Sequence, residues 1–434
     1  MLKTIRDVIK TRKVKNKLLY TIIILFVIRM ISQIPVPGVN PDFFKNYFGS
    51  DNNVFGFLNM FTGGGFERMS VFALSIIPYI TSSIIIQLMT ISFPRLEQLS
   101  KEGESGRKKL MKYTQYVTLG LSILESAAMV ISLKNALIID FTWLNALTIV
   151  ATLSGASMFL VWLGGRITEN GIGNGISMIL LVNIISGIPT DFRVIYDSFI
   201  QGKNLPKTVL AVAVTVLIVV AIVYLTLIVN NAERRIPVQY SQKMQGRRFV
   251  NGESSFIPLK INTSGVIPVI FAMSLMALPN IFLSILGKHP GGAAGVILGM
   301  LNSSNWFNTD NWIYTCGYIL YALLIVFFAY FYTAITFNPI EIADNLKKAG
   351  AAIPGIRPGK PTELYLKKIL KHVIMIGAIG LLAVCTIPFL ISGFLHINVS
   401  FGGTSLIIIT SVVLEAARQM KAMLSEKNFN TFLR

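Results

Sequence analysis

The sequence is poor in charged, sulfur-containing and imidazole side chains. Only 14% of its 434 residues are charged, only 20 are Asp or Glu, and it has two cysteines and three histidines. The histidines are scattered without a His-Glu-x-x-His or similar spacing, so we expect no metal site. The cysteines fall in separate apolar runs without Cys-x-x-Cys spacing, which argues against a disulfide framework.

Enzyme motifs are scarce too. The chain has no Gly-x-x-x-x-Gly-Lys-Ser/Thr loop, so it has no recognisable means of hydrolysing nucleotides. Residues 171–175, GIGNG, superficially resemble a phosphate-binding loop, but the start of a helix at a membrane surface fits them better. No nucleophile motif stands out, and we expect neither a catalytic residue nor a cofactor.

Apolar residues make up 53% of the chain and gather in runs of about the length that spans a bilayer. These runs predict an all-α polytopic membrane protein with ten transmembrane helices. The ten windows are 18–34, 71–91, 113–133, 143–163, 172–188, 209–229, 261–286, 313–337, 373–391 and 401–417.

The 39 Lys and Arg residues are distributed unevenly over the segments between these windows. With a cytoplasmic N-terminus, the cytoplasmic segments hold 31 of them and the outer segments hold seven. Because basic loops stay on the cytoplasmic side, this asymmetry predicts that both termini are cytoplasmic. The fifth window is short, but without it the six basic residues of 231–260 would lie outside and the asymmetry would collapse.

Charged side chains inside the windows are few, namely Arg29, Glu125 and Glu415. An ion-coupled carrier usually needs a midplane carboxylate; Glu125 could serve, but an ion pair or an interfacial position fits it equally well. Uncharged polar residues cluster at 81–87 in the second window and at 262–264 in the seventh. Two interpretations stay open for them: hydrogen bonds between packed helices, or a separable, partly wet seam.

Residues 57–80 read FLNMFTGGGFERMSVFALSIIPYI and place three glycines and a Glu-Arg pair directly in front of the second window. Glycine triplets destabilise helices, and irregular backbone is tolerated at membrane depth only where protein buries it or it lines a water-filled cavity. The stretch therefore predicts a broken helix beside a cavity, on the outer side of the membrane.

Two cytoplasmic segments, 231–260 and 338–371, mix basic residues with proline, glycine and apolar residues. This mixture predicts ordered projections. Two explanations of their charge stay open: membrane topology alone, or docking to an acidic partner such as ribosomal RNA or a cytosolic protein.

Six stretches resemble the bacterial SecY family, the channel subunits of the general protein translocase. They follow the family's order over nearly the whole chain and read NMFTGGGFERMSVFALSIIPYITSSIIIQLM, KEGESGRKK, ITENGIGNGIS, GVIPVIF, FNPIEIADNLKKAGAAIPGIRPG and FGGTSL. The resemblance implies two inverted five-helix halves around a central hourglass pore, with a re-entrant plug segment. It also implies a protein-conducting channel in the bacterial plasma membrane, and disfavours the alternatives of a secondary transporter or an intramembrane enzyme.

On this sequence, the resemblance implies five parts. They are a cytoplasmic basic arm at 1–17, an N-terminal half at 18–188, an external hinge loop at 189–208, a C-terminal half at 209–417 that carries the docking loops 231–260 and 338–371, and a cytoplasmic tail at 418–434.

Four groups of site residues follow from the same resemblance. The pore ring would be Ile76, Ile80, Ile176, Leu180, Ile270 and Ile408, with Leu180 where the family often has isoleucine. The plug, at about 57–70, would include Asn59, Phe61, Gly63, Gly64, Gly65 and Met69. The lateral gate would include Ser83, Gln87, Asn262 and Thr263, and the docking residues would be Arg247, Arg248 and Arg357.

The implied partners are the SecE and SecG subunits, the SecA motor ATPase, the ribosome, unfolded preproteins with their signal peptides, and membrane lipid. SecA, chain elongation at the ribosome and the proton-motive force would supply the energy, and hydrophobic segments would leave the pore sideways into lipid. No cofactor is implied, and no role is assigned to Glu67 and Arg68.

Overall fold

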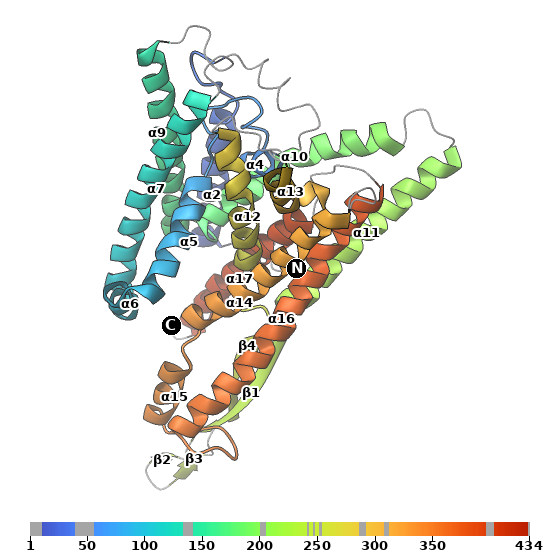
Figure 1. The fold of residues 1–434 in the computed structure, drawn as a ribbon. Helices are drawn as coiled ribbons and strands as arrows, with labels where there is room; N and C mark the ends of the chain where they lie inside the picture. The colour runs from blue at the N-terminus through green and yellow to red at the C-terminus, as the bar shows by residue number, and fades with distance from the viewer. Residues whose placement is uncertain are drawn as a thin grey trace.

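The structure is a computed structural model that describes residues 11–39, 56–132, 142–199, 205–240, 243–245, 248–250, 254–285, 292–307, 312–395 and 403–432. Each of the ten apolar windows coincides with one long helix (Figure 1). These helices are α2 (Arg12–Ile31), α5 (Ile77–Ser92), α7 (Glu104–Ser132), α9 (Trp143–Asn170), α10 (Gly175–Phe199), α11 (Leu205–Asn231), α12 (Ile267–Ile285), α14 (Thr315–Thr336), α16 (Lys360–Leu395) and α17 (Gly403–Phe432).

Length and composition alone qualify four stretches of the described residues to cross a membrane, built on α7, α9, α14 and α16. A fifth forms when α5 is joined to α6 (Pro94–Lys101), which it meets at 107°. Several of the remaining helices are shorter in their apolar part, as α10 and α12 are. Proline lies inside α10, α12 and α16, where neighbouring helices can satisfy the freed backbone groups.

The second window does not form a helix from its beginning. Residues 63–76 are a series of turns, and α5 begins only at Ile77, with Pro78 in its first turn. Proline suits this position because its missing N–H would have no partner in a first turn. Ser75, just before α5, has a positive φ of 50°, a conformation that a helix cannot continue.

Four helices, α2, α7, α11 and α16, begin earlier than the apolar windows indicated. α2 starts at Arg12 and α16 at Lys360, so basic residues assigned to loops extend each helix beyond its apolar part. Lysine and arginine favour helices nearly as well as leucine does, and charge alone does not end one.

The basic segments 231–260 and 338–371 fold together into one projection at the lower end of α16 (Figure 1). Strand β1 (Glu233–Tyr240) pairs antiparallel with β4 (Ser254–Lys260) and with β5 (Ala351–Ala352), giving the order β4-β1-β5. Strands β2 (Lys243–Gln245) and β3 (Arg248–Val250) form a second small sheet, and α15 (Pro339–Lys348) completes the projection. A separate apolar cluster holds it together: Ile236, Val238, Leu259, Ala351, Ile353 and Leu366.

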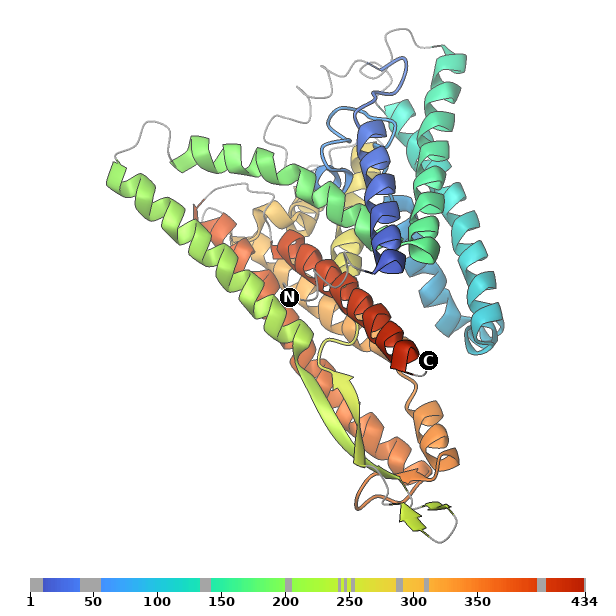
Figure 2. The same cartoon turned by 180° about the vertical axis from the view of Figure 1, so that it is seen from behind.

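One large apolar cluster joins nearly all the long helices. The short helix α4 (Gly56–Thr62) contributes to it and contacts α10. Viewed from behind, α2, α9 and α7 lie on one side and α11 on the other, and α17 runs across the centre between them (Figure 2). Helix α13 (Gly292–Leu301) and the short helices η2 (Ser303–Asn305) and η3 (Trp312–Tyr314) precede α14.

Candidate pore, plug and docking surfaces

The predicted plug consists of α4 and the turns that follow it. Gly63 and Gly64 have φ values of 63° and 81°, a region that glycine enters at little cost. Their N–H groups donate to the carbonyls of Met60 and Asn59 at 3.3 and 3.0 Å, which closes the end of α4. Gly65 needs no positive φ, but a Cβ there would lie 2.8 Å from Ser70 Oγ.

After the glycines the chain runs back along the end of α2. Val36 N–H donates to Met69 O and Val71 N–H donates to Ile34 O, both at 2.9 Å, and Pro35 and Ser70 form an antiparallel bridge. The C-terminal end of the plug is therefore hydrogen-bonded to the segment that follows α2.

Glu67 and Arg68 have clear partners in the structure. Asn59 Nδ2 donates to Glu67 Oε2 at 3.0 Å, and Glu67 N–H donates to Asn59 Oδ1 at 3.4 Å, so the two residues close a loop inside the plug. Arg68 Nη1 donates to Gln33 Oε1 at 2.5 Å, at the end of α2. The pair thus fixes the plug's internal shape and its attachment to α2.

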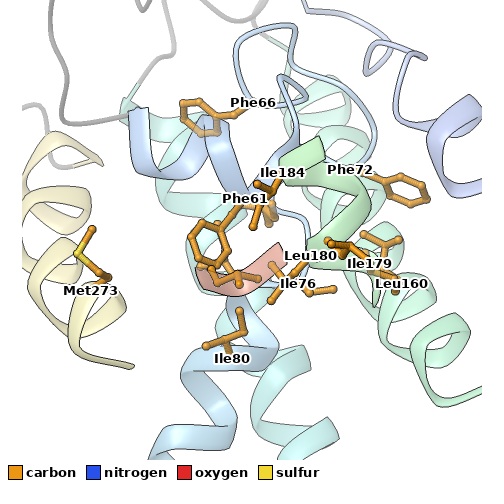
Figure 3. Packing of buried hydrophobic residues seen from close by; sticks show 14 of the residues in the cluster. Phe61, Phe66, Phe72, Ile76, Ile80, Leu160, Ile179, Leu180, Ile184 and Met273 are labelled. Carbon is orange, nitrogen blue, oxygen red and sulfur yellow. The ribbon is translucent and has the colours of Figure 1, made fainter. Parts of the chain in front are cut away.

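The residues of the predicted pore ring meet the plug in one apolar cluster. Ile76, Ile80, Leu180 and Ile408 are buried, and Ile176 and Ile270 are half-buried against the same cluster. Phe61, only 1% exposed, lies directly over Ile76 and Ile80, with Leu180 and Ile184 on one side and Met273 of α12 on the other (Figure 3). The Ile176 side chain also packs on α9, where a Cβ on Gly164 would lie 2.7 Å from its Cδ1. Such contacts have no directional bonds.

Four polar side chains hold the plug, and only Arg29 among them stood out in the sequence. Asn183 Nδ2 donates to Phe61 O at 2.8 Å and to Ser75 Oγ at 3.2 Å, and Ser75 Oγ donates to Phe61 O at 3.2 Å. Arg29 Nη2 donates to Gly63 O at 2.9 Å, and Ser186 Oγ, which also donates to the Asn183 carbonyl at 2.6 Å, lies 3.3 Å from Gly63 O. A polar side chain inside an apolar run was the sequence feature that could have identified these residues. By this feature Arg29 was noted in the sequence, whereas Asn183 was not.

The predicted gate residues find partners within their own halves. Gln87 Nε2 donates to Ser83 Oγ at 2.9 Å within α5, while Asn262 Nδ2 donates to Asn230 Oδ1 of α11 at 2.7 Å. Thr263 Oγ1 donates to Lys260 O at 2.8 Å. Helix α12 contacts both α5 and α7.

Gln87 and Asn262 share one property. Each keeps a buried side-chain oxygen that accepts no hydrogen bond within the described part of the chain. A buried acceptor without a partner costs about 1–3 kcal/mol, which favours a seam that water or a passing chain can enter.

Of the predicted docking residues, Arg357 is the one whose side chain is described. It is exposed, and its turn is flanked by Gly355 and Gly359, whose φ values are 80° and 99°. Thr362 Oγ1 donates to the Arg357 carbonyl at 2.9 Å, which fixes the backbone beneath the exposed guanidinium. Arg247 lies outside the described residues, and Arg248 belongs to β3.

Within the described residues, no group of three or more His, Cys, Asp or Glu side chains is arranged to hold a metal ion.

Fold and site together define a polytopic helical membrane channel whose centre is filled by a short segment. The SecY family model matches residues 70–417. The SecY subunit of the protein translocase of Streptomyces scabiei is 37% identical over 450 residues, covering 100% of both chains. A solved structure described as a protein-conducting channel has a TM-score of 0.64 at 18% identity, covering 94% of this chain and 92% of its own. Sec61 in a canine ribosome–channel complex from the endoplasmic reticulum has a TM-score of 0.60 at 16% identity, covering 94% and 92%.

The chain belongs to the SecY family. It is a multi-pass membrane protein that works as a protein-conducting translocation channel and not as an enzyme. The predicted family, fold class and channel function are confirmed.

Proposed function

We propose that the plug and the pore ring together close the resting channel, and that the chain passes unfolded preproteins once the plug leaves. One observation carries this proposal: Phe61 of the plug is buried on Ile76 and Ile80, which stand at the start of α5 beside Leu180 (Figure 3). A ring of aliphatic side chains excludes ions by dewetting, yet yields around a passing chain because it forms no directional bonds.

Hydrophobic segments leave sideways, between α5 and α7 on one side and α12 and α14 on the other. The contacts of α12 with α5 and α7, and the side-chain oxygens of Gln87 and Asn262 that accept no hydrogen bond from the described residues, support a seam that opens at this place. Insertion into lipid is then a partition: apolar side chains gain by leaving water, while a charge at the helix centre costs about 2.5–3.5 kcal/mol on insertion scales.

Crosslinking from the channel tests both routes. A photoreactive residue at Ile80 is expected to label the polar part of an arrested preprotein, and one at Gln87 is expected to label its apolar signal segment. Leu147 on α9, 69% exposed and away from the seam, is the matched control position. Equal labelling of the preprotein from Leu147 and Ile80 would contradict passage through the ring.

Other molecules bind the channel and supply the energy that drives transport. The SecA ATPase and the ribosome dock on the projection of β1, β4, β5 and α15 and supply the driving force together with the proton-motive force. SecE and SecG associate with the helices. The ordered backbone beneath Arg357 and the excess of basic residues support docking. The channel lies in a bacterial plasma membrane with both termini cytoplasmic, as the distribution of Lys and Arg favours.

Arg357→Glu is expected to lower SecA-driven transport into inverted vesicles about tenfold or more, because it reverses an exposed charge at the docking surface. Lys421→Glu, the same charge change at an exposed position of α17, is the control and is expected to keep transport near wild type. Transport and thermal unfolding of both variants are measured side by side. Full transport by Arg357→Glu would sink the docking proposal.

A further inference from the structure

The end of α4 leaves two backbone carbonyls for partners outside the plug. The last carbonyl groups of a helix receive no hydrogen bond from N–H groups of the same helix, so they need donors from elsewhere. Here the carbonyls of Asn59, Met60 and Thr62 accept the N–H groups of the three glycines at 3.0, 3.3 and 3.3 Å. The Phe61 and Gly63 carbonyls instead accept hydrogen bonds from side chains of other segments.

The donors come from three separate places in the chain. Asn183 and Ser186 lie on α10, Arg29 on α2 and Ser75 just before α5. Two of them serve the Phe61 carbonyl and two serve the Gly63 carbonyl, at distances between 2.8 and 3.3 Å. We name these four side chains, Arg29, Ser75, Asn183 and Ser186, the plug clasp.

Burial makes the plug clasp specific to the seated plug. Phe61 and Ser75 are each 1% exposed and Asn183 is 4% exposed, so water does not replace these donors while the plug is in place. When the plug leaves, the carbonyls gain water, while the Asn183 amide loses the Phe61 carbonyl and keeps only the longer bond to Ser75 Oγ. An interaction made in only one of two states shifts the equilibrium toward that state.

The backbone conformation of Ser75 also depends on the seated plug. It adopts a positive φ of 50°, which is unfavourable for a residue with a Cβ, and in this conformation its hydroxyl reaches Phe61 O and accepts from Asn183. Strain of this kind persists only where the surroundings hold it, and the bond to the plug is one of those restraints.

We propose that the plug clasp is the polar element that sets the resting occupancy of the plug, with Asn183 as its central positioning residue. This inference rests on the proposed role of the plug. It adds that opening is governed by hydrogen bonds to the plug backbone as well as by the aliphatic ring.

The test compares Asn183→Leu with Asn280→Leu in vesicles. Asn280 is an equally buried amide that donates to the Leu298 carbonyl of α13 at 3.3 Å, away from the plug. Plug release is read from the labelling rate of Met69→Cys by a hydrophilic maleimide, in a background with Cys316→Ser and Cys385→Ala, because Met69 is fully buried while the plug is seated. Ion conductance of the resting channel is the second readout.

Asn183→Leu is expected to raise both the labelling rate and the conductance about three- to tenfold over Asn280→Leu, since it removes the hydrogen bond to the Phe61 carbonyl of the plug. Faster labelling without higher conductance would support the plug clasp but overturn the plug as a seal. Unchanged labelling, or a leak without faster labelling, would overturn the plug clasp.

A second pair of variants tests the plug clasp independently if Asn183→Leu fails to fold. Ser75→Ala removes only one hydroxyl of the plug clasp and is expected to raise labelling about fivefold. Ser82→Ala removes an equally buried hydroxyl on α5 that donates to Pro78 O of its own helix at 2.6 Å, and is expected to leave labelling unchanged. Equal rates in these two variants would count against the plug clasp.

Discussion

Replacing Ile80 and Ile270 by serine is expected to make resting vesicles leak ions. Ile80 is buried next to Phe61, and Ile270 packs on the same cluster from α12. Each replacement exchanges an aliphatic side chain for a hydroxyl that binds water, which weakens the dewetting that bars hydrated ions. If each lowers the barrier by about 1 kcal/mol, conductance rises roughly thirtyfold. Single-channel recording or ion flux from loaded vesicles measures it.

The control must lose the same amount of apolar packing elsewhere. Ile149 and Leu153 on α9 are both fully buried in the same cluster but do not belong to the predicted ring. Serine at these two positions is expected to lower thermal stability without raising conductance, because each loses a buried aliphatic group outside the predicted ring. If this pair leaks as strongly as the ring pair, loosened packing and not an open ring explains the leak.

The ten long helices could be predicted from the sequence because bilayer thickness and backbone hydrogen bonding leave an apolar chain few alternatives. The ends of those helices could not. Hydropathy marks where a helix is apolar, whereas α16 continues through the basic residues from Lys360 onward, and the turns before Ile77 follow from Ser75 and Pro78. The backbone conformation of single residues decides where these helices begin. Hydropathy averaged over a window of many residues does not reveal that conformation.

The sheet in the projection of β1, β4, β5 and α15 was expected only as an ordered region. In β1, just Ile236 and Val238 alternate inward, and the strand carries Pro237 between them. Its partner β5 contributes two residues from a segment more than a hundred positions away. Two inward-facing residues are too few to reveal the two-residue period of a strand. The stability of the sheet comes from pairing between segments far apart in the sequence.

In the candidate site, too, the local backbone could be predicted from the sequence but the long-range contacts could not. The glycine triplet predicted a broken helix beside a cavity, since irregular backbone at membrane depth has to be enclosed. It did not predict what encloses it: Asn183 reaches Phe61 across 122 positions of sequence and Arg29 reaches Gly63 across 34. A single asparagine in an apolar run has no partner visible in the sequence, so its role emerges only from the folded chain.

Gly63→Ala is expected to unseat the plug far more than Gly64→Ala, although both glycines have positive φ. In that region a Cβ costs about 1 kcal/mol at either position, so the pair is matched for backbone strain. Space is what differs. A Cβ on Gly64 would meet nothing within 4 Å, whereas one on Gly63 would lie 2.5 Å from Ser186 Oγ, 2.8 Å from Arg29 Nη1 and 2.8 Å from the Asn183 carbonyl.

The Asn183 carbonyl is backbone of α10 and cannot turn away as a side chain could, so the methyl group must displace the plug. Overpacking of this kind costs about 1–3 kcal/mol beyond the strain. Gly63→Ala should therefore label Met69→Cys roughly five- to a hundredfold faster than Gly64→Ala, with conductance rising in step. Equal labelling in the two variants would show that the plug depends on the shape of its glycine turn and not on a close-fitting seat against α2 and α10.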